Sequence, residues 1–167
     1  MRYLVRERIF SVGTDFWIED EYGNRPFYVD GKALSLREAC ELKGPDGELL
    51  TRMHKRLMSM RDTMAIEDAG GHTIAKVRPA FFSPIRHRYE IDLADGQRLE
   101  ALGNFTDKDW ELISPDGQIV GRVSRHWFRI RDIYGVEVAP GVSDPLIISI
   151  AVCIDHIHTD QRERHDR

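Results

Sequence analysis

Apolar and polar residues alternate in short runs along most of the chain. In residues 73–78 and 118–123, for example, apolar side chains gather on one face of an extended segment. A period of two is typical of half-buried β-strands. Turn residues such as Asp95-Gly96 and Pro115-Asp116-Gly117 separate these runs, and glycine supplies the positive φ that a tight turn needs. The pattern therefore predicts short antiparallel strands joined by hairpins.

The strand–turn–strand pattern recurs at a regular interval. Five units begin 23 or 24 residues apart, at Ser35, Ser59, Ser83, Thr106 and Arg129. Residues 15–32 add another hairpin before the repeats, and residues 2–10 add one more strand. A period of this length also occurs in solenoids and propellers, but a solenoid would not need the apolar segment that follows. The count comes to about twelve strands.

An almost wholly apolar segment, PLIISIAVCIDHI, occupies residues 145–157. Its richness in Ile and Val is compatible with a buried strand. Asp144 as the N-cap, Pro145 at the first helical position and the length of the segment favour a helix. A helix that is apolar on all sides must be buried on all sides.

Together these elements predict a mainly β fold, a closed antiparallel barrel of about twelve strands around a central C-terminal apolar helix. An eight-stranded barrel is filled by its own side chains, whereas a wider barrel leaves a space that a helix can fill. We expect residues 1–160 to form a single domain and residues 161–167 to form a polar tail.

Composition and charge exclude several classes of protein. The formal net charge of −4 argues against broad nucleic-acid binding. The apolar run 146–154 is too short for a membrane-spanning helix, which needs about 20 residues, and the first ten residues lack the apolar stretch of a secretory signal. Cys40 and Cys153 do not suggest a disulfide framework. We therefore expect a cytoplasmic protein with reduced thiols.

Six stretches combine into a more specific signal. They are LMSMRDT at 57–63, IAKV at 74–77, FSPIR at 82–86, GNF at 103–105, WF at 127–128 and RDIYGV at 131–136. With the closing helix, they resemble the LURP-one-related family, which shares the Tubby C-terminal-like fold with Tubby proteins and phospholipid scramblases. Leu36-Arg37-Glu38-Ala39 departs mildly from the family's Leu-Arg-Asp-Thr.

The resemblance implies a twelve-stranded barrel around a C-terminal helix, with no well-defined biochemical activity. Tubby relatives bind phosphoinositides, and scramblases are associated with lipid bilayers. No Tubby lipid-binding motif matches this sequence. Lipid binding is therefore implied by analogy of fold alone.

Candidate catalytic chemistry is sparse. The chain has no Gly-x-Ser-x-Gly elbow, no P-loop and no dinucleotide-binding glycine motif. The nearest approach to a metal site is DHIHTD at 155–160, but His156 and His158 are two residues apart and do not share a helix face. We interpret this stretch as the solvated end of the helix, near its negative pole. We predict no cofactor, no metal and no enzymatic activity.

The repeat register predicts a separation of charge between the two barrel ends. The hairpin turns carry Asp46, Asp95 and Asp116, whereas the connections between repeats are basic and aromatic. The candidate binding residues on these connections are Lys55, Arg56, Arg125, His126, Trp127 and Arg129. Basic and aromatic groups together suit an anionic lipid headgroup or an acidic partner. The alternative is a set of ordinary solvated corners with aromatic side chains that plug the barrel mouth.

From these patterns we expect a non-enzymatic binding or scaffold protein. Its basic end would contact an anionic membrane lipid, with a phosphoinositide-like headgroup, or a protein partner, and the chain would be cytoplasmic and peripheral at the membrane. The alternative is an enzyme or small-ligand binder with an unrecognised site at a barrel mouth.

Overall fold

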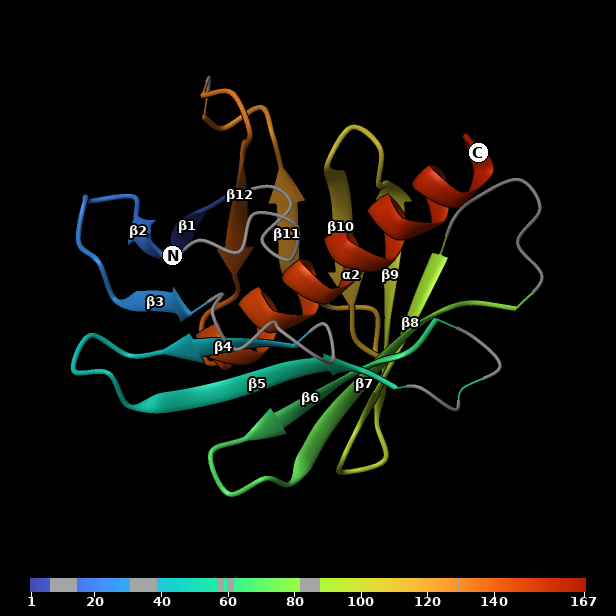
Figure 1. The fold of residues 1–167 in the computed structure, drawn as a ribbon, viewed down its shortest axis with the longest axis horizontal. Helices are drawn as coiled ribbons and strands as arrows, with labels where there is room; N and C mark the ends of the chain where they lie inside the picture. The colour runs from blue at the N-terminus through green and yellow to red at the C-terminus, as the bar shows by residue number, and fades with distance from the viewer. Residues whose placement is uncertain (7–14, 31–38, 57–58, 60–61, 82–87, 129) are drawn as a thin grey trace.

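The alternation of apolar residues directs one face of each strand into a common interior. The computed structural model describes residues 1–6, 15–30, 39–56, 59, 62–81, 88–128 and 130–167. Each strand pairs in antiparallel fashion with the next one along the chain, and β1 pairs with β12 to close the ring (Figure 1). The predicted closed, mainly β barrel of twelve strands around a C-terminal helix is confirmed.

The strands are short and follow one another around the barrel. Their bounds are β1 Arg2–Arg6, β2 Phe16–Asp20, β3 Phe27–Asp30, β4 Ala39–Lys43, β5 Leu49–Lys55, β6 Met64–Asp68, β7 Thr73–Pro79, β8 Arg88–Leu93, β9 Arg98–Asn104, β10 Asp109–Ile113, β11 Ile119–Ser124 and β12 Ile133–Val138. Helix α2 follows at Asp144–His165.

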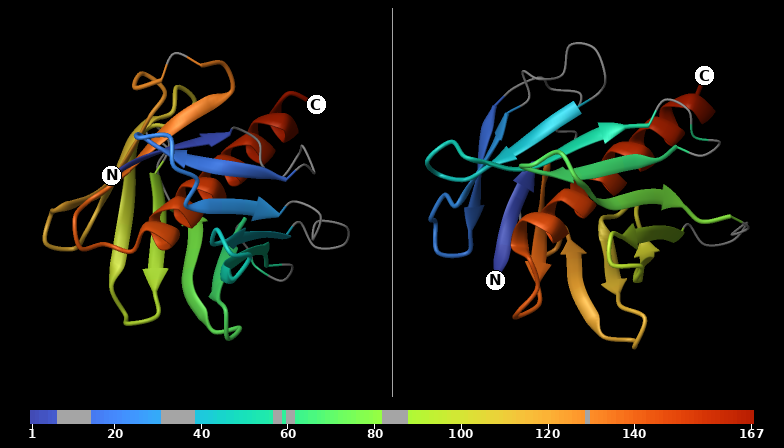
Figure 2. Two further views of the ribbon diagram at one scale, coloured as in Figure 1. Left: turned by 90° about the vertical axis from the view of Figure 1, so that its left-hand side faces the viewer. Right: turned by 90° about the horizontal axis from the view of Figure 1, so that it is seen from below.

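Helix α2 fills the interior of the barrel, as its apolar sequence predicts (Figure 2). Ile148, Ile150 and Cys153 are completely buried, against inward-facing strand residues such as Val5 and Ile91. Burial of one such aliphatic side chain contributes about 1.5–3 kcal/mol. The helix is therefore the core on which the strands pack.

The one polar residue within the apolar run, Ser149, has hydrogen-bonding partners inside the core. Its hydroxyl donates to the carbonyl of Pro145 at 2.6 Å and lies 2.7 Å from the hydroxyl of Thr51 on β5. A buried hydroxyl without a partner would cost about 1–3 kcal/mol. This pair therefore links the helix to one strand at a defined register.

The start of the helix differs from the sequence prediction. The N-cap is Ser143, whose hydroxyl accepts a hydrogen bond from the backbone N–H of Leu146. Asp144 is already helical and accepts a hydrogen bond from the hydroxyl of Tyr3 on β1 at 2.5 Å. The predicted N-cap was therefore wrong by one residue, because the carboxylate is occupied by a strand residue and the preceding serine caps the helix instead.

Both cysteines are buried and unbonded. Burial raises the pKa of the Cys40 thiol to about 12 and that of the Cys153 thiol well above its ordinary value. Cys153 therefore packs as a small buried hydrophobic residue within the helix.

The two ends of the barrel differ in what they carry. The hairpins β4–β5, β8–β9 and β10–β11 turn at one end, which we call the turn end, and helix α2 begins there, after β12. Asp46, Asp95 and Asp116 lie in these turns. The connections β5–β6, β9–β10 and β11–β12 lie at the opposite end, which we call the helix-exit end because α2 leaves the barrel there.

Candidate functional site

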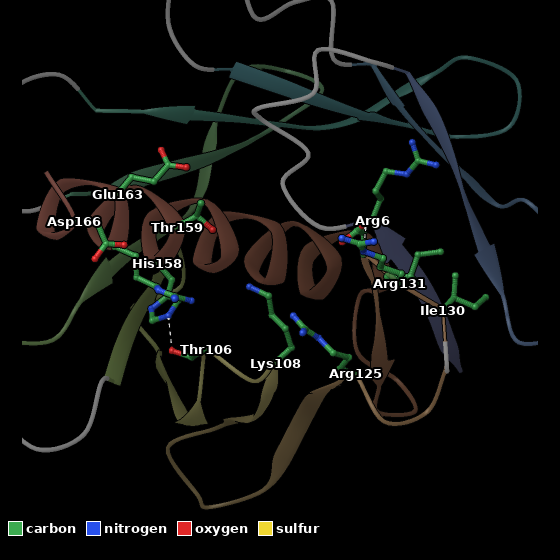
Figure 3. A pocket seen from close by; sticks show the side chains of 13 residues that line it. Arg6, Thr106, Lys108, Arg125, Ile130, Arg131, His158, Thr159, Glu163 and Asp166 are labelled. Carbon is green, nitrogen blue, oxygen red and sulfur yellow. Dashed lines mark hydrogen bonds and ion pairs between the residues drawn. The ribbon is translucent and has the colours of Figure 1, made fainter.

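A cavity of about 860 Å³ opens at the helix-exit end, between helix α2 and the rim of the barrel (Figure 3). Its rim is formed by the end of β1 and by the β9–β10 and β11–β12 connections. Cationic side chains predominate among the charged residues that line it, namely Arg6, Lys108, Arg125, Arg131 and Arg162. The acidic ones are Asp132, Glu163 and Asp166.

The floor of this cavity holds a buried ion pair. The ammonium of Lys108 contacts the carboxylate of Asp155, and the two side chains are only 9% and 6% exposed. The ammonium also lies 6.0 Å from the centre of the Tyr134 ring. The pair joins the β9–β10 connection to the helix, and it places one cation deep in the mouth of the barrel.

His158 lies beside this ion pair, also at the cavity floor. Its Nε2 lies 3.1 Å from the hydroxyl of Thr106 and its Nδ1 3.4 Å from the hydroxyl of Tyr89. Burial, followed by the negative charges of Asp155 and Asp62, raises the pKa of the Tyr89 hydroxyl. That hydroxyl therefore stays protonated at any physiological pH.

A network of charges fastens the helix to the opposite side of the barrel mouth. Asp160 accepts hydrogen bonds from Lys55 on β5 and from Arg164, each at 3.0 Å, and Arg164 also contacts Asp62 at 3.1 Å. Burial alone would raise the pKa of Asp160, but the hydrogen bond from Lys55 and the surrounding positive charges outweigh it, so the pKa lies below its ordinary value. The helix is thus tied to the β5–β6 side, and the cavity opens on the other side.

The structure separates the predicted binding residues into different environments. Lys55 belongs to the network around Asp160, whereas Arg56 and His126 are exposed. Arg125 is exposed and lines the cavity. Arg129 lies outside the described residues.

Trp127 packs on the outer wall of the barrel. A Cβ atom added to Gly135 on β12 would come within 2.6 Å of the Trp127 ring, and the guanidinium of Arg2 lies 4.5 Å from the centre of that ring. Gly135 therefore provides the space that the ring occupies. The ring is only half-buried, and its role at a binding surface stays a prediction.

Sequence reasoning missed the floor of the cavity. It assigned 155–160 to the solvated end of the helix, but Asp155 and His158 are buried, at 6% and 5% exposure, because the helix continues for two more turns to His165. Lys108 gave no signal, because a lysine in a predicted connection between repeats is ordinarily solvated. The one available clue was the spacing of three between Asp155 and His158, which places both on one helix face.

The described residues contain neither a membrane-spanning helix nor a cluster of metal-binding side chains. No described helix is both long and apolar enough to cross a bilayer. Three or more His, Cys, Asp or Glu side chains do not come together as a metal site in the part of the chain that the structure covers.

A barrel of twelve antiparallel strands that encloses its own C-terminal helix defines a narrow class of proteins. The chain belongs to the LURP-one-related family, whose model matches residues 1–155. It is 25% identical over 163 residues to the uncharacterized protein YxjI of Bacillus subtilis strain 168, with 95% of each chain covered. An X-ray structure of an Arabidopsis thaliana protein has a similar fold, with a TM-score of 0.69 and 15% identity over 94% of this chain and 91% of that one.

Proposed function

We propose that this protein is a non-enzymatic binding protein that contacts anionic phospholipid membranes through the helix-exit end. The observation that carries the proposal is the cavity at that end, where the arginines that line it stand next to exposed apolar side chains. Arginine donates to phosphate oxygens, and each basic residue near an anionic membrane surface contributes about 1 kcal/mol.

Exposed side chains on the rim support this orientation. The Arg131 side chain is 95% exposed, and Ile130 beside it is 52% exposed. Phe81, 54% exposed, follows β7 at the same end. Exposed apolar residues flanked by cations suit the interfacial region of a bilayer, where phosphate groups and acyl chains meet. Because the whole chain has a net charge of −4, the attraction to an anionic membrane would be confined to this basic end.

The test is co-sedimentation with vesicles of phosphatidylcholine alone or of phosphatidylcholine mixed with phosphatidylserine. We expect binding only to the anionic vesicles, and we expect it to fall as salt screens the surface charges. The triple variant Arg56→Gln/Arg125→Gln/Arg131→Gln should lose about fivefold in affinity for each charge removed.

A matched control removes three exposed arginines elsewhere, Arg25→Gln/Arg98→Gln/Arg122→Gln, with the same change in net charge. This control should bind like the wild type. Equal binding to neutral and anionic vesicles, no binding to either, or equal losses in both triple variants would contradict the proposal and favour a protein partner.

A further inference from the structure

Ion pairs between directly opposed residues cover much of the outer wall of the barrel. They join neighbouring strands as Arg2–Glu137, Arg52–Glu41, Arg78–Glu90, Arg98–Asp92 and Arg122–Glu111. At the junction of β2 and β3, blue in Figure 2, the opposed residues are instead Trp17 and Tyr28, whose ring centroids are 5.0 Å apart. Trp17 is 40% exposed. A wall of charged pairs thus has an exposed aromatic pair at this junction.

Carboxylates flank the Trp17 ring along β2. Asp15 and Glu19 lie two residues before and two residues after Trp17, so the three side chains are on the same, outer face of an extended segment. The Tyr28 hydroxyl donates a hydrogen bond to Asp15. This bond, together with partial burial and the negative charges of Asp15 and Asp30, raises the pKa of Tyr28 to about 12. The aromatic pair therefore lies in a negative local field.

The cations that contact these carboxylates leave the Trp17 ring uncovered. Arg25 contacts Glu19 at 3.0 Å, and because both side chains are largely exposed, the pair contributes little and can exchange partners. Lys43 contacts Asp30 at 2.8 Å. Within the described ranges, no ammonium or guanidinium lies over Trp17. A carboxylate has about four acceptor positions, so one that already accepts a hydrogen bond can accept another.

The protein contains a completed version of this arrangement on the same wall. The guanidinium of Arg2 lies 4.5 Å from the centre of the Trp127 ring, and its Nε lies 2.8 Å from the carboxylate of Glu137. A tryptophan face and a carboxylate thus hold one arginine between them. Trp17 has the ring and the flanking carboxylates of this arrangement, and its cation can come from another molecule.

We propose that Asp15, Trp17, Glu19 and Tyr28 form a docking site for an arginine-bearing segment of a protein partner, which we call the aromatic wall site. One guanidinium stacks on Trp17 and donates to a flanking carboxylate. Arginine suits the site better than lysine, because a planar guanidinium can stack on a ring and donate from its edge at the same time. None of the four residues lines the cavity at the helix-exit end, so this interaction goes beyond the proposed membrane contact.

The test compares two capped peptides of equal length, one of alternating glycine and arginine and one of alternating glycine and lysine. Each carries a fluorescein label, and its affinity for the full chain is measured by fluorescence anisotropy at low salt. We expect the arginine peptide to bind about fivefold more tightly, because stacking on Trp17 favours a guanidinium. Both affinities should fall as salt screens the carboxylates.

Substitutions at Trp17 separate the role of the ring from a role in folding. Trp17→Leu should weaken binding of the arginine peptide about fivefold and remove its advantage over the lysine peptide, whereas Trp17→Tyr keeps a ring and should retain most of that advantage. Tyr22→Leu, at a 74% exposed aromatic residue in the β2–β3 turn, is the matched control and should bind like the wild type. Melting temperatures verify that the variants fold.

The flanking carboxylates are tested in the same assay. Asp15→Asn/Glu19→Gln should weaken both peptides, whereas Asp95→Asn/Asp116→Asn makes the same change in net charge at two other turns and should weaken neither. Equal affinity for the two peptides, no binding of the arginine peptide, full affinity in Trp17→Leu, or equal losses in the two double variants would overturn the inference.

Vesicle binding distinguishes the aromatic wall site from the membrane contact. Trp17→Leu should co-sediment with phosphatidylserine vesicles like the wild type, because Trp17 does not line the cavity. A loss of vesicle binding in this variant would place the ring at the membrane and overturn the inference. Peptide binding without vesicle binding would contradict the membrane proposal alone, whereas vesicle binding without peptide binding would contradict the docking site alone.

Discussion

Lys108 combines an unfavourable backbone conformation with a buried charge, and it makes two contacts that offset these costs. Its ammonium contacts Asp155, and its backbone carbonyl accepts a hydrogen bond from the N–H of Arg125 at 3.0 Å. The β9–β10 connection is thereby fixed both to the helix and to the start of the β11–β12 connection. One residue thus sets the shape of the cavity floor.

Removal of one member of the Lys108–Asp155 pair should lower the free energy of unfolding more than removal of both. Lys108→Met leaves the Asp155 carboxylate buried without its counter-charge, and we expect a loss of about 3–5 kcal/mol in the free energy of unfolding. Lys108→Met/Asp155→Leu should recover most of that loss. Urea denaturation of the wild type, the two single variants and the double variant gives the coupling energy. Additive losses would show that the pair contributes nothing specific.

The network around Asp160 should make stability depend on pH. Because the pKa of Asp160 is lowered by folding, its contribution is present above the unfolded value of about 3.9 and is lost as the pH falls through the lower folded value. Asp160→Asn should therefore lower the free energy of unfolding at pH 7 by about 1 kcal/mol, which is measured as a lower melting temperature. The difference in melting temperature between the variant and the wild type should shrink below about pH 4. Asp46→Asn, at an exposed turn, is the control.

The sequence predicted the residues at the outer part of the site better than those at its floor. The positions of Arg56 and Arg125 could be predicted from strand periodicity, because each residue comes just after a strand that ends at the helix-exit end. The burial of Lys108 and His158 depends on where the helix leaves the barrel, which no local pattern encodes. Tertiary contacts, rather than propensity, decide such positions.

Among the elements, the hairpin turns show most directly how sequence determines conformation. Gly96 and Gly117 have φ of 88° and 82°, which confirms the positive φ expected of the Asp-Gly turns. Nothing lies within 4 Å of a Cβ added to Gly117. The requirement for glycine there is therefore conformational rather than steric.

Substitutions at Gly117 should separate these two causes. Gly117→Ala should lower the free energy of unfolding by about 1–2 kcal/mol, because alanine pays the full cost of positive φ. Gly117→Asn should cost less, since asparagine adopts this conformation more readily. Equal losses in thermal denaturation would point to a cause other than backbone conformation.

Helix α2 should be sensitive to small changes in volume within its apolar stretch. Ile150 is fully buried, so Ile150→Ala should cost about 2–5 kcal/mol, and Ile150→Asp should leave no folded protein. Ile130→Ala, at a half-exposed position, should change stability by about 0.5 kcal/mol or less. A normal melting temperature for Ile150→Asp would show that the helix is not the core.

The ends of an element were predictable where the hydrophobic pattern changes its period. They were missed where the apolar pattern ends but the element continues. The apolar pattern ends near Ile157, yet the helix continues to His165. The extension is supported by the pair between Asp160 and Arg164, four residues apart, and by contacts from Lys55 and Asp62 on the barrel. Only the first of these is visible in the sequence, and such a pair stabilises a helix by only a few tenths of a kcal/mol.

Closure of the ring pairs the two strands that lie farthest apart in the sequence, β1 and β12. Residues of β1 pair with residues of β12, as in Val5 with Tyr134, whereas the other strands pair with their neighbours in sequence. Contacts between residues far apart in sequence carry the largest loop-closure entropy. We therefore expect closure to occur late in folding.

Folding kinetics test this order. Val5 on β1 and Ile91 on β8 are equally buried, at 0% exposure. Val5→Ala should mainly accelerate unfolding, whereas Ile91→Ala, within a local hairpin, should mainly slow folding. Stopped-flow traces over a range of urea concentrations separate the two rates. Slower folding in Val5→Ala would show that the ends of the barrel meet early.

The position of the core after the strands in the chain has a consequence for synthesis. Every strand emerges from the ribosome before helix α2, which adds 22 residues after all of them. At about 5–20 residues per second, translation of the helix alone takes roughly one to four seconds. During that interval the apolar faces of twelve strands have no interior to enclose. We therefore expect the nascent chain to be prone to aggregation until the helix is available to fill the barrel.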